Sequence, residues 1–170
     1  MSLSGRRSAR GICCWPSFGH NDEKDDPERH TDLGSTFPDY MRRYADAALK
    51  AGAMAALITP VSRRYFLPDG NLLYTHGEYP LAVRSLAAQC GLPCIDLESL
   101  SRRLYLSMGK EAAAELFVRI PKGENKQYPD GLEDLTHFCP EGAGRIAALV
   151  AGALARVPRL AGFIGGSSFT

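Results

Sequence analysis

Residues 53–61 read Ala-Met-Ala-Ala-Leu-Ile-Thr-Pro-Val, and this continuous apolar run decides the fold class of the chain. A strand with one face in water alternates apolar and polar residues, whereas a strand covered on both faces is apolar throughout. Residues 92–97, Leu-Pro-Cys-Ile-Asp-Leu, form a second short run of the same kind. The two runs therefore predict parallel strands that are buried between layers of helices.

A helical pattern precedes the first run. The predicted helix starts at Thr36, with Thr36 and Asp39 as a capping-box-like pair, Pro38 in the first turn and Gly52 as the stop signal. Its predicted apolar face consists of Tyr40, Tyr44, Ala47, Ala48 and Ala51.

Further helices are predicted after each run. One extends from Tyr79 to Cys90, one passes through residues 100–108, and the last begins after Cys139. The last helix has Pro140 in its first turn and an apolar face made of Ile146, Leu149, Val150, Ala153 and Leu154. Residues 62–77 are predicted to form a long loop, and residues 119–133 are polar and are predicted to be irregular.

The order of strands and helices predicts an α/β fold in three layers, with a parallel sheet between helices. Sheets of this kind bind ligands at the carboxyl ends of their strands. Two polar segments are expected at that edge, namely Gly19-His20-Asn21-Asp22 and the loop that follows Pro60. We therefore expect the functional residues to lie in these segments.

Composition limits the classes of partner. A chain of 170 residues with 45% hydrophobic residues fits one domain, and a formal net charge of +1 attracts neither nucleic acid nor an anionic membrane. The 5 cysteines have no metal-finger spacing, so reduced thiols are expected. We find no secretory signal and no transmembrane segment, which makes a cytoplasmic location the default expectation.

Several residues could supply the groups that an ester hydrolase needs. His137 can act as a base, and Asp134 can accept the imidazole proton if both side chains of an irregular segment point inward. Asn21 offers an amide donor for an oxyanion, and Gly19 allows close approach of the backbone. Arg63 and Arg64 follow the first apolar run and could pair with an acidic sugar such as galacturonate.

Each of these motifs has an ordinary structural alternative. An Asp-x-x-His pair is common by chance, and a histidine near a helix start often caps or packs. Asn21 and Asp22 could open an Asx turn, and Arg63 with Arg64 could be a solvated pair. A metal site built from His20, Asp22, His30 and His137 is not expected, because the acidic loop has no fixed ligand geometry.

Five segments in this order resemble the rhamnogalacturonan acetylesterase-like branch of the SGNH (GDSL-like) hydrolases. They are residues 18–22, 58–64, 77–80, 94–97 and 134–138. The resemblance implies a flavodoxin-like parallel sheet with His137 as the base, Asp134 as its partner, and Asn21 and Gly19 at the oxyanion. It also implies hydrolysis of acetyl esters on an acetylated carbohydrate without a metal or organic cofactor.

The chain departs from the family before residue 18. The family carries its nucleophile in a Gly-Asp-Ser block, and the sequence contains no such triplet. Residues 1–17 are interpreted as an unmatched segment, residues 18–156 as a partial SGNH domain and residues 157–170 as a tail. We expect an N-terminally truncated sheet without its first two strands, with self-association through the exposed edge.

A missing nucleophile changes the functional prediction. Ser17 and Ser62 are alternative nucleophiles, but neither has the strand-turn-helix setting that exposes a catalytic serine. Cys13 or Cys14 could serve as a thiol nucleophile only in an environment that lowers its pKa, and packing is the more common role. The sequence therefore predicts a serine esterase by family, a carboxylic ester hydrolase in which hydrolysis is impaired. The alternative is a non-catalytic remnant that binds carbohydrate or a protein partner.

Overall fold

The computed structural model describes residues 13, 14 and 16–161. In chain order its elements are β1 (Cys13–Cys14), α1 (Thr36–Lys50), β2 (Met54–Ala55), β3 (Leu57–Ile58), α2 (Tyr79–Cys90), β4 (Cys94–Ile95), α3 (Leu97–Ala114), β5 (Phe117–Ile120), β6 (Leu132–Phe138) and α4 (Pro140–Leu154). The chain is thus a mixed α/β protein with small parallel and antiparallel sheets.

The first predicted apolar run lies at the centre of the parallel strands. β1 pairs with β2 and β3 pairs with β4, both in parallel, and a further parallel bridge joins Ser17 to Ile58. Only Ala56 separates β2 from β3, so residues 54–58 have β1 on one side and β4 on the other. The prediction of two buried parallel strands is confirmed.

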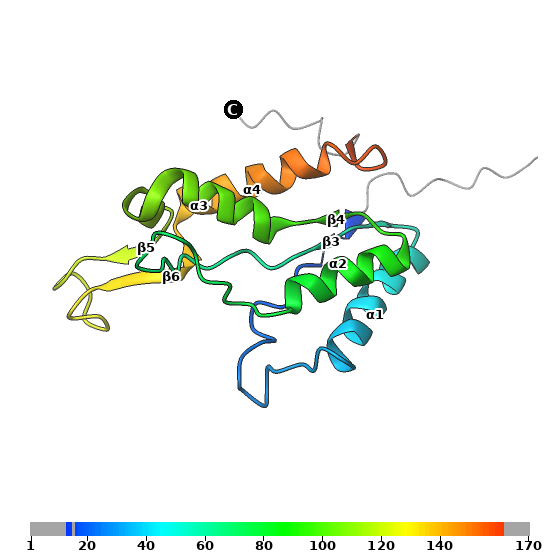
Figure 1. Cartoon of the computed structure of the whole chain (residues 1–170), viewed down its shortest axis with the longest axis horizontal. Coiled ribbons are helices and arrows are strands. Elements are labelled where there is room, and N and C mark those ends of the chain that lie inside the picture. The colour runs from blue at the N-terminus through cyan, green and yellow to red at the C-terminus, as the bar shows by residue number, and fades with distance from the viewer. Residues whose placement is uncertain (1–12, 15, 162–170) are drawn as a thin grey trace, which may run out of the picture.

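Helices cover these strands on both sides. Leu57 packs with the apolar residues of α1 and α2, whereas Ala56 and Ile58 pack with Leu154 of α4. Side chains of a strand alternate between its two faces, which explains why neighbouring residues enter different clusters. Figure 1 shows α1 and α2 on one side of β3 and β4, and α3 and α4 on the other.

The antiparallel hairpin was not expected from the sequence. Residues 119–133 were predicted to be irregular, which is wrong at both ends, because β5 and β6 pair in antiparallel fashion from Phe117 opposite Phe138 to Ile120 opposite Leu132. The rings of Phe117 and Phe138 lie 4.8 Å apart and fasten the hairpin to the core. Charged residues on the exposed face of the hairpin hide the alternation in the sequence.

Helix α1 begins where it was predicted but buries a different face. Ser35 precedes the helix without a side-chain cap, and Thr36 Oγ1 instead accepts a hydrogen bond from the Asp32 N–H at 2.7 Å. The predicted capping pair is therefore wrong. Tyr40 and Tyr44 are 46% and 51% exposed, because the face that packs on the sheet and α2 carries Phe37, Met41, Ala45 and Ala48.

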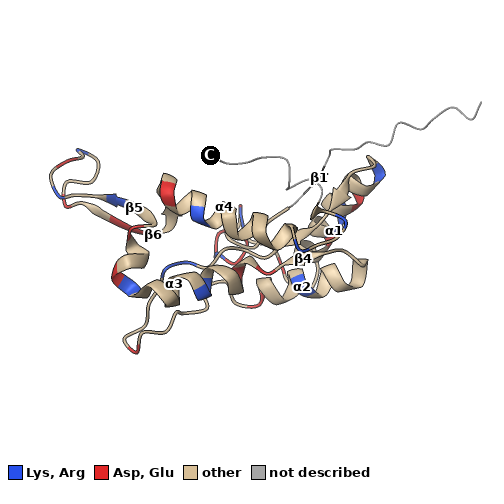
Figure 2. Ribbon diagram, turned by 90° about the horizontal axis from the view of Figure 1, so that it is seen from above, with Lys and Arg blue, Asp and Glu red and all other residues tan. Residues whose placement is uncertain are grey.

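The other helix predictions are close to the structure. Helix α2 spans the predicted residues and ends at Gly91, whose φ of 64° is the left-handed conformation that glycine adopts without strain. Helix α4 starts at Pro140 and packs its predicted apolar face in the cluster around Leu154. Acidic and basic residues are interspersed along the elements (Figure 2). No helix among the described residues has the length and apolar character needed to cross a membrane.

Candidate functional site

The segment that carries Asn21 is a turn just after β1. Gly19 has a φ of 99°, and a Cβ there would lie 3.1 Å from Tyr79 Cβ, so both conformation and space favour glycine. The Asp22 carboxylate accepts the Gly19 N–H at 2.8 Å and the Thr31 hydroxyl at 2.9 Å. The side chain of Asn21 is exposed and makes no hydrogen bond to a described residue. The turn thus presents the Asn21 amide to solvent while the Gly19 N–H is already engaged.

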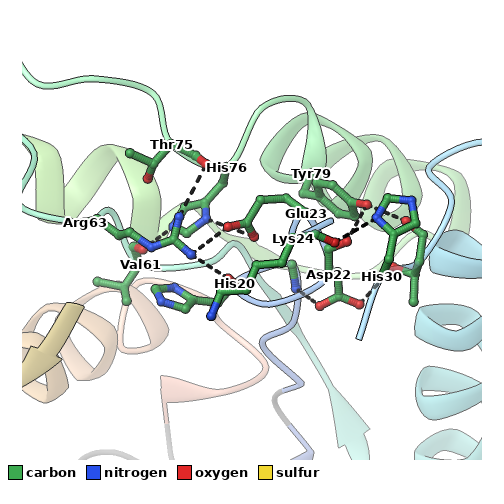
Figure 3. Close-up of polar contacts among 12 residues, drawn as sticks. His20, Asp22, Glu23, Lys24, His30, Val61, Arg63, Thr75, His76 and Tyr79 are labelled. Carbon is green, nitrogen blue, oxygen red and sulfur yellow. Dashed lines mark hydrogen bonds and ion pairs between the residues drawn. The ribbon is translucent and has the colours of Figure 1, made fainter. Parts of the chain in front are cut away.

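A largely buried polar network of Arg63, Glu23 and His76 contacts this turn (Figure 3). Arg63 Nη2 donates to Glu23 Oε1 at 2.6 Å and to the carbonyl of His20 at 2.8 Å. Glu23 Oε2 lies 3.6 Å from Nδ1 of His76, a residue that is only 1% exposed and whose Nε2 lies 2.8 Å from the Val61 carbonyl. The network joins the turn to the loop that follows β3.

The histidines of this network are held in the neutral state. Burial, together with the neighbouring His76 and Arg63, lowers the pKa of His20 to about 4 in spite of the opposing effect of Glu23. Burial also lowers the pKa of His76, whose ring lies 4.7 Å from that of His20. Two uncharged imidazoles beside an Arg–Glu ion pair avoid repulsion with the guanidinium.

The His–Asp pair lies in β6 where the register of this strand against β5 shifts, so the irregular segment that was predicted here is a local irregularity within a strand. His137 Nδ1 is 2.7 Å from Asp134 Oδ2, and the N–H groups of Thr136 and His137 donate to Oδ1 at 2.6 and 2.8 Å. The side chain of His137 is 77% exposed and that of Asp134 is 17% exposed. A histidine held through Nδ1 presents Nε2 to solvent, as a general base must.

The charge of Asp134 is stabilised by its own segment. Burial opposes ionisation of Asp134, but the hydrogen bonds from the backbone and ring of His137 and from the Thr136 N–H together outweigh it and hold the pKa below its usual value. A carboxylate that stays ionised can stabilise an imidazolium next to it.

Arg64 contacts the strand that carries the His–Asp pair. Its backbone N–H donates to the Leu135 carbonyl at 2.9 Å and its Nη2 to the Asp134 carbonyl at 3.3 Å. Arg64 is only 4% exposed, and its guanidinium lies over the ring of Phe117. Both predicted substrate residues, Arg63 and Arg64, are therefore engaged within the protein, and their contact with a substrate stays a prediction.

Sequence reasoning missed the groups that support the turn. Glu23 lies in the acidic run after Asn21, where a solvated side chain is the ordinary expectation, and neither His76 nor Tyr79 was predicted to be a functional residue. The Tyr79 hydroxyl is within hydrogen-bonding distance of the carbonyls of Asp22 (2.8 Å) and Thr31. These contacts span 48 to 57 residues of sequence, so no local pattern indicates them.

The alternative nucleophiles differ in access. Ser17 is exposed and its hydroxyl lies 3.5 Å from the Thr59 carbonyl, whereas Ser62 is 3% exposed and donates to the Arg63 carbonyl. The side chains of Cys13 and Cys14 lie outside the described part of the structure. In the residues that are described, no group of three or more His, Cys, Asp or Glu side chains could hold a metal ion.

An apolar groove of about 520 Å³ lies next to the Asn21 turn and is bordered by Phe18 and Asp22. Its other lining residues come from α1, and they are Phe37, Tyr40, Met41, Arg43, Tyr44 and Ala47. The rings of Phe18 and Tyr44 are stacked at 5.0 Å. The exposed face of α1 is thus the wall of a groove that reaches the candidate site.

The chain is similar in sequence to two proteins of known or probable function. No protein-family model matches the chain. It is 42% identical over 134 residues to rhamnogalacturonan acetylesterase RhgT of Bacillus subtilis, and 34% identical over 135 residues to the probable rhamnogalacturonan acetylesterase YesY of the same organism. These matches cover 79% of this chain, and 56% and 58% of the two relatives.

The fold is also found among solved structures. The crystal structure of protein YXIM from Bacillus subtilis superposes with a TM-score of 0.68 at 22% identity, covering 86% of this chain and 37% of that one. A mixed α/β chain with a His–Asp pair at a strand end is the class that fold and site define. The chain is homologous to rhamnogalacturonan acetylesterases, and it spans a little over half the length of the relatives that it matches.

Proposed function

We propose that this chain carries part of a carbohydrate acetylesterase site of the SGNH type on a flavodoxin-like sheet, with residues 18–156 as a partial domain. In this proposal His137 is the base, Asp134 orients it, and Asn21 and Gly19 serve the oxyanion. The observation that carries it is the 2.7 Å contact between His137 Nδ1 and Asp134 Oδ2, with the rest of the imidazole exposed.

The chemistry follows from the direction of that contact. When Nδ1–H donates to the ionised Asp134, the lone pair of His137 Nε2 is free to take a proton from an attacking hydroxyl. The imidazolium that forms is stabilised by the carboxylate and gives the proton to the sugar oxygen as its bond to the acetyl carbon breaks, so that attack by water releases acetate and the free sugar hydroxyl.

The oxyanion of the tetrahedral intermediate needs hydrogen-bond donors. The exposed Asn21 side chain can supply one. The Gly19 N–H donates to Asp22 at 2.8 Å, so Gly19 could serve only after Asp22 releases this group. Asn21 is therefore the stronger candidate of the two.

Hydrolysis by this chain is expected to be slow. The sequence contains no Gly-Asp-Ser triplet, and removing the nucleophile of a serine hydrolase costs roughly 10⁶-fold in kcat. What remains is base-assisted attack by water, or by Ser17 if its exposed hydroxyl reaches the ester. The proposed substrate is an acetylated carbohydrate related to rhamnogalacturonan, and the proposed chemistry needs no metal or organic cofactor.

The test is acetate release from acetylated rhamnogalacturonan, and hydrolysis of p-nitrophenyl acetate, by the whole chain. We expect a low rate that His137→Ala reduces further and that His30→Ala, a change at another exposed histidine, leaves unaltered. Ser17→Ala then separates attack by serine from attack by water. Equal rates for the unmodified chain and His137→Ala would remove His137 from the proposal.

A second candidate function is carbohydrate binding without hydrolysis. The groove beside Phe18 supports it, because exposed aromatic rings such as Tyr40 and Tyr44 stack on sugar rings. Calorimetric titration with rhamnogalacturonan oligosaccharides should then show binding that Tyr44→Ala weakens and His137→Ala does not. An acidic sugar could also pair with Arg63 or Arg64, but it would first have to displace their partners inside the protein.

We further propose that the chain associates with itself through the edge of its parallel sheet. Among the described residues, β1 pairs with β2 and with no other strand. An unpaired edge of a sheet offers N–H and C=O groups to another strand. Sedimentation velocity should show dimers or larger species at micromolar concentration, and a monomer under these conditions would contradict this proposal.

A further inference from the structure

Two consecutive arginines reach the two separate halves of the candidate site. We propose that Arg63 and Arg64 are positioning residues, and that together they set the Asn21 turn and the His137 strand relative to each other. Their partners lie 43 and 70 residues away in the sequence. The positioning role rests on the proposed function, because it presumes that the two halves form one site. The contacts of the two arginines are present in the structure whether or not the chain hydrolyses esters.

Arg63 holds the turn at the peptide that leads into Asn21. Its Nη2 donates to the His20 carbonyl at 2.8 Å and to Glu23 Oε1 at 2.6 Å, so one guanidinium bridges both ends of the turn. Arg63 and Glu23 side chains are 16% and 14% exposed, which makes the ion pair largely inaccessible to water. A charge-assisted contact in such surroundings fixes geometry more firmly than one at the surface.

His76 lies on the opposite side of Glu23 but does not anchor it through a hydrogen bond. Its Nε2 lies 2.8 Å from the Val61 carbonyl, two residues before Arg63, and its Nδ1 lies 3.6 Å from Glu23 Oε2. These two buried atoms, His76 Nδ1 and Glu23 Oε2, have no hydrogen-bond partner among the described residues. The second oxygen of Glu23 therefore gives it no alternative anchor, and Arg63 is the partner that determines where Glu23 lies.

Arg64 holds the other half through the backbone of β6. Its N–H and its Nη2 bind the carbonyls of Leu135 and Asp134, which lie between the carboxylate of Asp134 and the ring of His137 along the chain. Phe117 packs 5.5 Å beneath the guanidinium and belongs to β5, so Arg64 contacts both strands of the hairpin. Its 4% exposure shows that it is built into the core and is not free to follow a ligand.

Because Arg63 and Arg64 are adjacent in the sequence, a single peptide unit connects the anchor of the Asn21 turn to the anchor of β6. A change at residue 63 should loosen the turn and leave β6 in place, and a change at residue 64 should do the opposite. A general loss of stability predicts something different, namely loosening of both segments and of the helices as well.

Hydrogen–deuterium exchange on the whole chain distinguishes these outcomes. We expect Arg63→Met to speed exchange of the amides in residues 19–31 by about tenfold without changing residues 132–138, and Arg64→Met to do the reverse. Arg145→Met is the matched control, because the Arg145 side chain is 58% exposed and its ion pair among the described residues is with Glu141 on its own helix. It should change neither segment.

Conservative variants keep the test decisive if a methionine variant does not fold. Arg63→Lys and Arg64→Lys retain the charge but not the two-pronged geometry, so they should loosen the same segments to a smaller extent. Glu23→Gln should reproduce the effect of Arg63→Met. Equal loosening of both segments by either arginine variant, or no change in either segment, would overturn the proposal.

The result is separable from the proposed function. Segment-specific exchange without any ester hydrolysis would keep the positioning role and reject the esterase. Hydrolysis that depends on His137, with exchange that does not distinguish the two segments, would keep the esterase and reject the positioning role. Where hydrolysis is measurable, Arg63→Lys should lower kcat and leave KM unchanged, because the oxyanion donor acts on the transition state.

Discussion

The turn that carries Asn21 is held by residues far away in the sequence, whereas the contact that orients His137 is made within its own strand. Arg63 and Tyr79 reach the turn across 40 to 57 residues, and burial keeps water away from their contacts. Asp134 instead binds the backbone and ring of residues two and three positions later, and His137 is 77% exposed. The internal geometry of the turn therefore depends on long-range contacts, whereas the His137–Asp134 contact is local and only the placement of its strand depends on the distant Arg64.

This difference explains how the two halves should respond to change. A local arrangement survives when distant parts of a fold are altered, because its partners travel with it. A long-range network is lost as soon as one buried member is removed, because the partner that stays behind is charged and unpaired. The His–Asp pair should accordingly be the more robust of the two halves.

The largest change in the free energy of unfolding is expected where α4, which follows the His137 strand, packs on Leu116. A Cβ on Gly142 of α4 would collide with the Leu116 carbonyl oxygen, so Gly142→Ala should lower the free energy of unfolding by about 3 kcal/mol. Denaturant unfolding measures this. Gly152→Ala is the control in the same helix, because nothing lies within 4 Å of its added Cβ and alanine should stabilise the helix by about 0.5–1 kcal/mol. Equal effects would contradict the close packing of α4 on Leu116.

Removal of the Glu23 charge should have the next largest effect. Glu23→Gln leaves the Arg63 guanidinium largely buried without its ion-pair partner, so the free energy of unfolding should fall by about 2–3 kcal/mol. Glu133→Gln is a suitable control, because its pair with Arg119 is exposed and should contribute less than about 0.5 kcal/mol. Thermal unfolding of the two variants side by side would show whether burial separates them.

Acid should affect the two halves at different pH values. The folded pKa of His20 is about 4, below its usual 6.5, so the unfolded chain binds this proton first and stability falls as the pH drops from 6.5 to 4. His76, Arg63, Glu23 and Lys24 face His20, and the ring is only half-buried, so we expect a loss of about 1–2 kcal/mol. Asp134 has a folded pKa below 3.8, so its contribution is present above that pH and is lost as the pH falls further.

Urea unfolding at a series of pH values tests this separation. His20→Gln should weaken the pH dependence of the free energy of unfolding between pH 6.5 and 4, and the dependence that is left there should come from His76. Asp134→Asn should change this dependence only below pH 3.8. A His20→Gln variant with the full original slope would contradict the buried neutral histidine.

The smallest effect is expected from His137→Ala. Because the side chain is 77% exposed, its removal should change the free energy of unfolding by less than about 0.5 kcal/mol. The variant is therefore a clean probe of chemistry, since any change in hydrolysis would not result from unfolding. A large drop in the melting temperature would show that the ring contributes to stability beyond its exposed contact with Asp134.

Local signals in the sequence predicted the local parts of the structure. Helix α2 and its end at Gly91 follow from periodicity and one glycine, and the buried run at residues 54–58 follows from its lack of polar residues. The same reasoning failed for β5 and β6, because an exposed hairpin with charged residues has no apolar run to reveal it. It also placed Tyr40 and Tyr44 inside, where the larger contacts of Phe37 and Met41 prevailed.

The candidate site divides in the same way. His137, Asp134 and Asn21 could be named from short motifs, and the structure brings the first two together. The roles of Glu23 and His76 could not be predicted. Glu23 lies in a polar run and His76 in a loop, and the sequence does not show whether such side chains are solvated or buried. Their roles depend on distances between segments that only the folded chain defines.

The assignment of His137 as a base is tested most directly by the tautomer of its ring, measured by ¹⁵N–¹H correlation spectroscopy at a pH of about 8, where histidines are ordinarily neutral. We expect the proton on Nδ1, donated to Asp134, with Nε2 free, and we expect Asp134→Asn to abolish this preference. A proton on Nε2 in the unmodified chain would leave no lone pair facing solvent and would contradict the assignment of His137 as a base.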